Sequence, residues 1–175
     1  MVLASIPPVA ARPVAHAPLD SPIGRLWVAV SPRGLVAIDR GDAPRDGRGV
    51  EGVFDPDAVA PLLDELAAYF EGRRRTFSVP LDIGDAGPFD AAVWHAARRI
   101  PYGETVSYGE LAAMAGRPGA ARAAGNAMAR CPFSPVVPCH RVILADGTLG
   151  GWGSDTWVKR WLLDLERGAG VPPVR

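Results

Sequence analysis

The sequence predicts an α+β protein of two parts, a small N-terminal α/β domain with a short antiparallel sheet and a mainly helical C-terminal domain. Near the N-terminus, two short apolar runs are separated by turn residues, which is typical of a β-hairpin. A helix with an apolar stripe follows. In the C-terminal half, two short helices are separated by a turn of about four residues, the proportions of a helix-turn-helix. The chain of 175 residues is long enough for a hydrophobic core.

The hairpin comes first along the chain. Its strands are expected over Leu26–Val30 and Leu35–Ile38, joined by a Ser-Pro-Arg-Gly turn. Asp55 or Asp57 is then expected to cap a helix, because a carboxylate accepts hydrogen bonds from the free amides of the first turn. The apolar stripe of this helix has helical spacing and comprises Val59, Leu62, Leu63, Leu66, Tyr69 and Phe70.

A third strand is expected over Phe77–Leu81. Pro80 places it at an edge of the sheet, because proline cannot donate to a ladder of hydrogen bonds. Residues 84–87 indicate a linker, since the pattern changes from sheet-like to helical beyond them. The first nineteen residues contain four prolines and no basic start, so they predict a flexible extension and not a signal peptide.

Helical patterns dominate the C-terminal half. Apolar residues within Phe89–Ile100 mark one helix. Ser107 and Glu110 have the S-x-x-E spacing of a capping box, which begins a second helix. A third helix is expected over residues 120–130 and a last one over residues 156–167. The residues of the last helix expected to face inward are Trp157, Val158, Trp161, Leu162 and Leu165.

These patterns divide the chain into four parts. We expect a flexible extension over residues 1–19, an N-terminal α/β domain over 20–84, a C-terminal domain over 86–168 and a tail over 169–175. Hydrophobic residues make up 48% of the chain and charged residues 22%, which excludes a wholly disordered protein.

The balance of charge excludes a polybasic nucleic-acid or membrane binder, because nineteen basic and nineteen acidic side chains cancel. The distribution is uneven, however. Residues 111–145 hold no acidic residue and four arginines, and such a cationic segment is a candidate anion-binding face. The arginines are Arg117, Arg122, Arg130 and Arg141. No apolar run approaches the roughly 18 residues of a membrane-spanning helix, so no membrane partner is expected.

The chain has two cysteines, Cys131 and Cys139. Two thiols are too few for a disulfide framework, and no Cys/His spacing indicates structural zinc. We therefore expect a reducing, cytoplasmic location. Cys139 stands in the sequence Pro-Cys-His-Arg-Val, where His140 can act as a base and Arg141 can add positive field to form the reactive thiolate. The structural alternative is a buried cysteine beside a surface histidine and arginine.

This pentapeptide, together with the helix-turn-helix before it and the glycine-rich loop and amphipathic helix after it, resembles the O6-alkylguanine-DNA alkyltransferases (methylated-DNA–protein-cysteine methyltransferases). The resemblance extends over about residues 20–168. Four further blocks occur in the family's order: Asp20–Gly24, Ile100–Thr105, Ser107–Ala112 and Ala121–Gly125.

The resemblance implies a winged-helix-like motif in the C-terminal domain and a function in DNA repair by direct reversal. The alkyl group of O6-alkylguanine, with O4-alkylthymine as a further candidate, would be transferred irreversibly from duplex DNA to Cys139. The damaged base must be rotated out of the stack to reach the protein. Each molecule would act once, because a thioether has no easy way back. A monomer, double-stranded DNA as partner and no cofactor are implied.

The resemblance also implies roles for the catalytic residues. Cys139 is the acceptor, His140 activates it through a water, and Glu166 orients the histidine. Tyr108 matches the tyrosine whose hydroxyl donates to guanine O6 as the alkyl group leaves. Without the resemblance, Glu166 would be a surface carboxylate and Tyr108 a partly buried residue at a helix start.

For DNA, Arg122 matches the arginine that fills the gap left by the extruded base. Ala121, Ala123 and Gly125 are small enough for the helix to approach the minor groove, although an alanine-rich helix packed on its neighbour is the structural alternative. Arg117, Arg130 and Lys159 are interpreted as ordinary solvated charges.

The resemblance also implies the residues of the substrate pocket. The carbonyls of Cys139 and Val142 would accept hydrogen bonds from the guanine amino group, and an amide near Gly153 would donate to O6. Trp152 would stack against the base, with a purely structural tryptophan as its rival interpretation. The pocket residues are Met128, Val142, Trp152 and Gly153.

Two departures from the family pattern stand out. Cys131 occupies the place of the usual hinge asparagine, which puts the hinge hydrogen bonds in doubt. No cysteine precedes position 131, so the zinc site of some relatives is not expected and no metal is predicted. Two other functions stay open from the residues alone: a non-catalytic binder of alkylated DNA, and a thiol redox regulator using Cys131 and Cys139.

Overall fold

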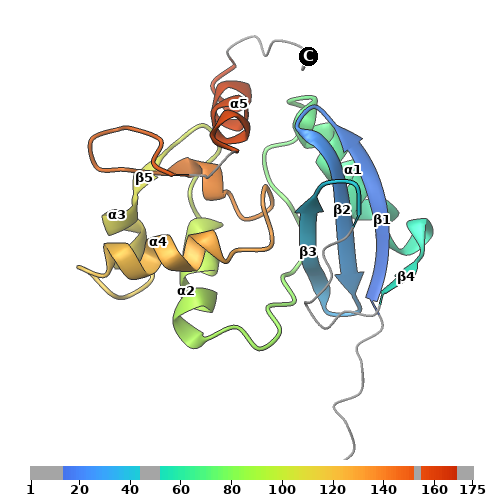
Figure 1. Cartoon of the computed structure of the whole chain (residues 1–175), viewed down its shortest axis with the longest axis horizontal. Coiled ribbons are helices and arrows are strands. Elements are labelled where there is room, and N and C mark those ends of the chain that lie inside the picture. Colours follow the sequence, from blue (N-terminus) through green and yellow to red (C-terminus); the bar gives the residue numbers. More distant parts are fainter. Residues whose placement is uncertain (1–13, 44–51, 152–154, 169–175) are drawn as a thin grey trace, which may run out of the picture.

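The computed structural model of the chain describes residues 14–43, 52–151 and 155–168. A four-stranded sheet with helix α1 behind it forms the N-terminal part, and a group of helices forms the C-terminal part beside it (Figure 1). Helix α5 lies above, between the two parts. This mixed architecture, with its helix-turn-helix, confirms the predicted fold class.

The sheet has the strand order β3-β2-β1-β4. Strands β1 (Val14–Ser21), β2 (Gly24–Ser31) and β3 (Gly34–Arg40) are antiparallel neighbours, and β4 (Gly52–Phe54) pairs in parallel with β1. The predicted hairpin is therefore confirmed as β2 and β3, with the turn residues between Ser31 and Gly34.

Strand β1 corrects the expectation of a flexible extension over residues 1–19. Val14–Leu19 are part of this strand, and Val14 and Ala17 are buried, while residues 1–13 lie outside the described part. The prolines misled the interpretation, because Pro18 is tolerated here. Strand β4 pairs only with Val14–His16, so Pro18 does not need an N–H to hydrogen-bond with β4.

The expectation of a third strand over Phe77–Leu81 is also wrong. Only Leu81 forms a bridge, with Leu35 of β3. The segment is extended because Pro80 accepts a 2.8 Å hydrogen bond from the Leu35 amide, but proline has no N–H with which to continue the ladder. The contact is close: a Cβ on Gly34, where φ is +135°, would lie 2.2 Å from the Pro80 oxygen.

Helix α1 (Pro56–Phe70) packs against β1 and β2. Asp55 is its N-cap and accepts a 3.1 Å hydrogen bond from the Ala58 amide, which confirms one of the two predicted caps. All of the expected stripe residues except the half-buried Leu63 are buried, and they form the inner face of the N-terminal part.

The C-terminal part confirms the predicted helix-turn-helix, with α3 (Tyr108–Met114) packed against α4 (Ala121–Ala129). Ser107 and Glu110 form the predicted capping box, in which the Ser107 amide donates to the Glu110 carboxylate at 2.6 Å and the Glu110 amide donates to the Ser107 hydroxyl at 3.2 Å. Helix α2 (Pro88–Ala97) supports both helices from below.

Two short strands and helix α5 (Thr156–Glu166) complete this part. Strand β5 (Val106–Ser107), directly before α3, pairs in parallel with β6 (Val142–Ile143). One buried core continues through both parts of the molecule. Trp157 corrects a further expectation: it does not face inward but is 42% exposed, with the Arg40 guanidinium 5.6 Å from its ring. Among the described residues, no helix has the length and apolar character to span a membrane.

Candidate active site

Cys139 begins a single 3-10 turn, Cys139–Arg141. Its amide donates to the Val137 carbonyl at 2.8 Å, and the Arg141 amide donates to the Pro138 carbonyl at 3.0 Å. Because this backbone is a turn and not a strand, neighbouring side chains do not alternate between opposite faces. The alternative of a surface histidine and arginine beside a buried cysteine is wrong, since His140 and Arg141 are both buried.

The carboxylate of Glu166 lies at the centre of this region and accepts five hydrogen bonds. Oε1 accepts from the Tyr69 hydroxyl at 2.7 Å, from His140 Nε2 at 2.7 Å and from Arg141 Nη2 at 2.8 Å. Oε2 accepts from Arg141 Nε at 2.8 Å and from the Gly103 amide at 3.0 Å. Glu166 is therefore a buried residue and not the surface carboxylate that its place at a helix end indicates.

The hydrogen bonds determine the charge states of this cluster. Burial alone would raise the pKa of Glu166, but the bonds from His140 and Arg141 outweigh it and hold that pKa far below its usual range. Burial lowers the pKa of His140, although Glu166 opposes the shift, so the imidazole is mainly neutral near pH 7.

The tautomer of His140 follows from its partner. A carboxylate only accepts hydrogen bonds, so the ring proton lies on Nε2, which contacts Glu166. The other ring nitrogen, Nδ1, is buried and has no hydrogen-bond partner within the described part of the chain. The arrangement leaves Nδ1 as a basic atom on the residue next to Cys139.

Tyr108 reaches the same region through the short parallel sheet. Val106 of β5 pairs with Val142 of β6, which follows the reactive turn, and Tyr108 comes directly after β5. Burial raises the pKa of Tyr108, and Cys139 raises it further, so the hydroxyl keeps its proton near neutral pH. Four residues singled out in the sequence thus lie in one region: Tyr108, Cys139, His140 and Glu166.

Lys159 corrects an interpretation made from sequence. It is not a solvated charge: the side chain is fully buried, and Nζ donates to the carbonyls of Val142 at 2.6 Å and Leu149 at 2.5 Å. Nζ also lies 5.9 Å from the centroid of the Tyr108 ring. Lys159 therefore ties the end of the reactive turn to the start of the next loop, and it occupies the Val142 carbonyl that was expected to accept from guanine.

Sequence reasoning missed the polar roles of Lys159 and Tyr69, although a signal was present. Lys159, Leu162 and Glu166 share one face of α5, so two charged residues lie on the buried stripe of an amphipathic helix. Lys159 is also the only lysine in a chain that otherwise uses arginine. Tyr69 was expected only as an apolar stripe residue, but its hydroxyl is part of the Glu166 cluster.

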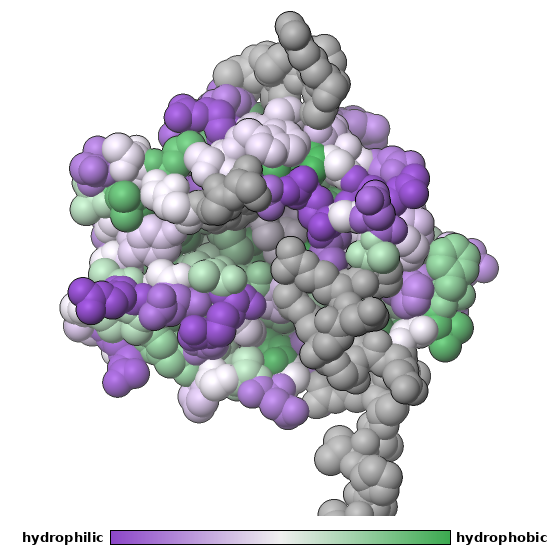
Figure 2. Space-filling view, viewed as in Figure 1, coloured by the Kyte–Doolittle hydropathy of each residue, from purple (hydrophilic) through white to green (hydrophobic). Residues whose placement is uncertain are grey.

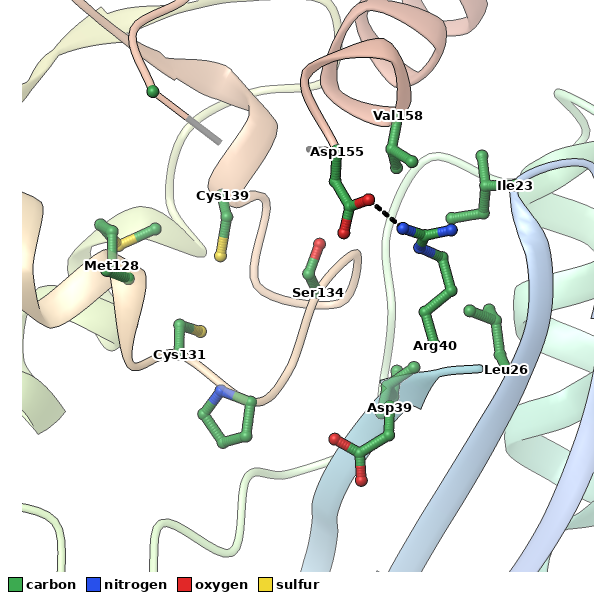
Figure 3. A pocket seen from close by; sticks show the side chains of 14 residues that line it. Ile23, Leu26, Asp39, Arg40, Met128, Cys131, Ser134, Cys139, Asp155 and Val158 are labelled. Atoms are coloured by element: carbon green, nitrogen blue, oxygen red, sulfur yellow. Dashed lines mark hydrogen bonds and ion pairs between the residues drawn. The ribbon is translucent and has the colours of Figure 1, made fainter. Parts of the chain in front are cut away.

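A cavity of about 360 Å³ opens beside Cys139 (Figure 3). Cys139, Met128, Cys131 and Ser134 lie on one side of it, and side chains from the sheet lie opposite them. The residues contributed by the sheet and its turn are Ile23, Leu26, Ile38, Asp39 and Arg40. Of the expected pocket residues, the structure places Met128 on this wall and buries Val142 behind it, whereas Trp152 and Gly153 lie outside the described residues.

Arg40 bridges the two sides of the cavity. Its guanidinium forms an ion pair with Asp155, the residue before α5 (Figure 3). Cys131 is half-buried, and neither Cys131 nor Cys139 forms a disulfide with the other. The Cys131 amide donates to the Met128 carbonyl at 3.2 Å, so the backbone at the expected hinge retains at least this bond. Within the described ranges, no three His, Cys, Asp or Glu side chains gather to hold a metal ion.

Helix α4 carries the residues expected to contact DNA. Arg122 and Ala123 are exposed, Ala121 and Gly125 are half-buried, and a Cβ on Gly125 would lie 3.7 Å from the Tyr108 ring. Hydrophilic side chains gather over the region of this helix, beside a more hydrophobic hollow (Figure 2). Within the described part of the chain, the Arg122 guanidinium makes no ion pair and no hydrogen bond.

The other two arginines of this region have protein partners. Arg130, at the end of α4, forms two 2.8 Å hydrogen bonds with Asp90 of α2. Arg117, in the turn between α3 and α4, lies 5.1 Å from the centroid of the Phe89 ring. Among the described residues, Arg122 is therefore the arginine of α4 whose guanidinium has no hydrogen-bond or ion-pair partner.

Two family models match most of the described part of the chain. Residues 14–83 match the family described as 6-O-methylguanine DNA methyltransferase, ribonuclease-like domain, and residues 88–168 match its DNA binding domain. The methylated-DNA–protein-cysteine methyltransferase of Mycobacterium tuberculosis is 43% identical over 149 residues, which are 85% of this chain and 90% of that protein. The DNA base-flipping protein of Thermus thermophilus is 40% identical over 85% of this chain and 97% of its own length.

A solved structure agrees with these relatives. The crystal structure of Mycobacterium tuberculosis OGT in complex with DNA has a TM-score of 0.80 and 42% sequence identity to this chain. The match covers 89% of this chain and 94% of that one.

Burial of Lys159 makes the stability of the folded protein depend on pH. Burial lowers the pKa of Lys159 to about 8, whereas the unfolded chain keeps the ordinary value of 10.5. Between these values the unfolded state binds more protons, so folding stability rises with pH across this window. As the pH rises across this window, we expect the free energy of unfolding of the native protein to increase by about 1 kcal/mol or more relative to that of Lys159→Met.

Chemical denaturation at pH values on both sides of the window measures this difference. Arg160→Met, which changes an exposed cation on the same helix, is the matched control and should leave the pH dependence unchanged. Because Lys159 is the only lysine, the NMR signal of its ε-carbon gives the pKa directly. A titration midpoint at the ordinary lysine value would contradict the prediction.

Proposed function

Since the chain belongs to the 6-O-methylguanine DNA methyltransferase family, we propose that Cys139 is the residue through which it repairs DNA. The protein is a methylated-DNA–protein-cysteine methyltransferase, which reverses alkylation directly by moving the alkyl group from guanine to one of its own cysteines. One observation carries the choice of cysteine: Cys139 stands in a fixed turn directly before the buried His140–Glu166 pair. Cys131 is followed in the sequence by Pro132 and Phe133, neither of which can act as a base.

The first step is the activation of Cys139. The thiolate and not the thiol is the nucleophile, so the proton must leave Sγ. Nδ1 of His140 would receive it through a bridging water, because Nε2 is committed to Glu166. Glu166 stabilises the imidazolium that results, and the ammonium of Lys159 favours the negative charge on Cys139.

The transfer itself exchanges one bond for another. The Cys139 thiolate attacks the alkyl carbon, a carbon–sulfur bond forms, and the bond between that carbon and O6 breaks with its electron pair going to guanine. The Tyr108 hydroxyl supplies a proton toward O6, and solvent replaces it. The product is a thioether, which has no easy reverse reaction, so each molecule repairs one base.

Repair in a duplex requires the base to leave the stack. A cavity of about 360 Å³ lies beside Cys139, and Met128, expected to meet the base, is part of its wall. Arg122 is exposed and has no partner among the described residues, which supports its role as the side chain that fills the gap left in the stack. Ala121, Ala123 and Gly125 support a close approach of α4 to the minor groove, because they are small.

Several finer features belong to the same proposal. We infer that the protein acts as a monomer, because one chain supplies Cys139, His140, Glu166 and Tyr108. A reducing, cytoplasmic location is consistent with two free thiols. The DNA partner is double-stranded DNA bearing alkylated guanine. The division into domains at residues 84–86 stays a prediction, and so does the acceptance of O4-alkylthymine.

Incubation with methylated duplex DNA tests the acceptor. We expect the intact mass of the protein to increase by one methyl group, which peptide mapping locates on Cys139. Cys139→Ser should accept no methyl group, and the matched variant Cys131→Ser should accept one as the native protein does. Methyl on another residue, or loss of transfer in Cys131→Ser alone, would show that the wrong cysteine has been assigned.

A second experiment separates DNA handling from chemistry. Arg122→Ala should slow repair of duplex DNA about tenfold or more but leave reaction with free O6-benzylguanine nearly unchanged, because extruding a base costs a few kcal/mol that the free base never requires. Arg117→Ala removes a nearby exposed charge and controls for general electrostatic attraction. Equal losses of Arg122→Ala on both substrates would mean that Arg122 supports the fold or the pocket.

A further inference from the structure

Tyr69 brings the N-terminal part of the molecule into the cluster around Glu166. It lies in the last turn of α1, 97 residues before Glu166 in the sequence, and its side chain is fully buried. The hydroxyl donates to Glu166 Oε1 at 2.7 Å and lies 3.4 Å from His140 Nε2. The proposed transfer uses Cys139, His140, Glu166 and Tyr108, and it leaves the Tyr69 hydroxyl without a role.

The ring of Tyr69 is held on several sides, so the hydroxyl has little freedom. Its centroid lies 5.5 Å from that of Phe70, 5.3 Å from that of Phe77 and 6.2 Å from that of Tyr102. These neighbours come from α1 itself, from the extended segment after it and from the loop after α2. A phenol fixed in this way can position a charged partner without reorganising.

The hydroxyl competes with His140 for the same oxygen. Oε1 of Glu166 accepts hydrogen bonds from Tyr69, His140 and Arg141, and each of these bonds stabilises part of the negative charge on that atom. Glu166 therefore stabilises a protonated His140 less when the Tyr69 hydroxyl is present than it would without it. Burial and the charge of Glu166 raise the pKa of Tyr69 well above its ordinary value, so the hydroxyl remains a donor throughout the range in which histidine titrates.

We propose that Tyr69 is a positioning residue for alkyl transfer: its hydroxyl shares the Glu166 Oε1 atom with His140 and so keeps the imidazole neutral as the base for Cys139. This inference rests on the proposed function of the His140–Glu166 pair. It also gives the N-terminal domain a direct part in the chemistry of the C-terminal domain.

The electrostatic surroundings of His140 define what the loss of this hydroxyl should do. The charged and titratable groups that face His140 are Glu166 and Lys159 from α5, Arg141 from its own turn and Tyr69 from α1. Tyr69→Phe removes one donor and no charge. Glu166 then interacts more strongly with a protonated imidazole, so His140 should protonate at higher pH and lose its function as a base there.

The test is the rate of Cys139 alkylation by free O6-benzylguanine, measured across the pH range of histidine titration. For Tyr69→Phe we expect the acid limb of the profile to move to higher pH, with a loss of about fivefold on that limb and a plateau at higher pH close to that of the native protein. The imidazole signals of His140 in NMR spectra should show the same upward shift.

Tyr102→Phe is the matched control. Its hydroxyl makes no hydrogen bond within the described residues, yet its ring packs against Tyr69 and lies 5.6 Å from the Arg141 guanidinium. We expect its profile to match that of the native protein. Thermal unfolding of both variants shows whether packing has changed.

The outcomes distinguish the proposal from simpler explanations. A loss of rate by the same factor at every pH, together with a lower melting temperature, would overturn it and leave Tyr69 as a packing residue. An unchanged profile in Tyr69→Phe would also overturn it. Failure of the proposed function has a different signature, because native Cys139 would then accept no alkyl group at any pH.

Discussion

The burial of one carboxylate, that of Glu166, organises this molecule. An unpaired buried charge is strongly destabilising, so the fold must supply compensating donors. Five hydrogen bonds do so, from Tyr69 of α1, from the Gly103 amide after α2, and from His140 and Arg141 of the reactive turn. Segments far apart in the sequence are therefore fixed relative to one another through a single side chain at the end of α5.

The same hydrogen bonds that satisfy the fold also prepare the chemistry. Arg141 balances the charge of Glu166, so the carboxylate remains ionised although it is buried. His140, next to Cys139, is held by Nε2 and keeps Nδ1 for a proton. Lys159 closes the other side of the site, since its ammonium holds the carbonyls of Val142 and Leu149. Stability and reactivity thus depend on one buried polar network, in which each member limits the freedom of the next.

Local patterns were sufficient to predict the elements whose signals lie within a few residues. The β2–β3 hairpin, the Asp55 cap and the capping box of α3 are examples, because turn and cap chemistry is short-range. Strand β1 was missed since its pairing with β2 outweighs its single proline, Pro18. Phe77–Leu81 was predicted as a strand but forms only the bridge at Leu81. In the site, the adjacent Cys139 and His140 could be found from sequence, and Lys159 left a signal as the only lysine, on the buried stripe of α5. The hydrogen-bond partners of Tyr69 and Lys159 could not be found. Their partners are distant in sequence, and only packing shows that polar atoms lie on apolar helix faces.

Through its hydrogen bond to Nε2, Glu166 fixes the tautomer of His140 and leaves Nδ1 as the base on the residue next to Cys139. The most direct measurement is a long-range ¹H–¹⁵N correlation spectrum of the histidine rings in the native protein near neutral pH, with His140 assigned by its absence in His140→Gln. We expect a neutral ring with a protonated Nε2 and an unprotonated Nδ1. A ring protonated on Nδ1, or on both nitrogens, would contradict it.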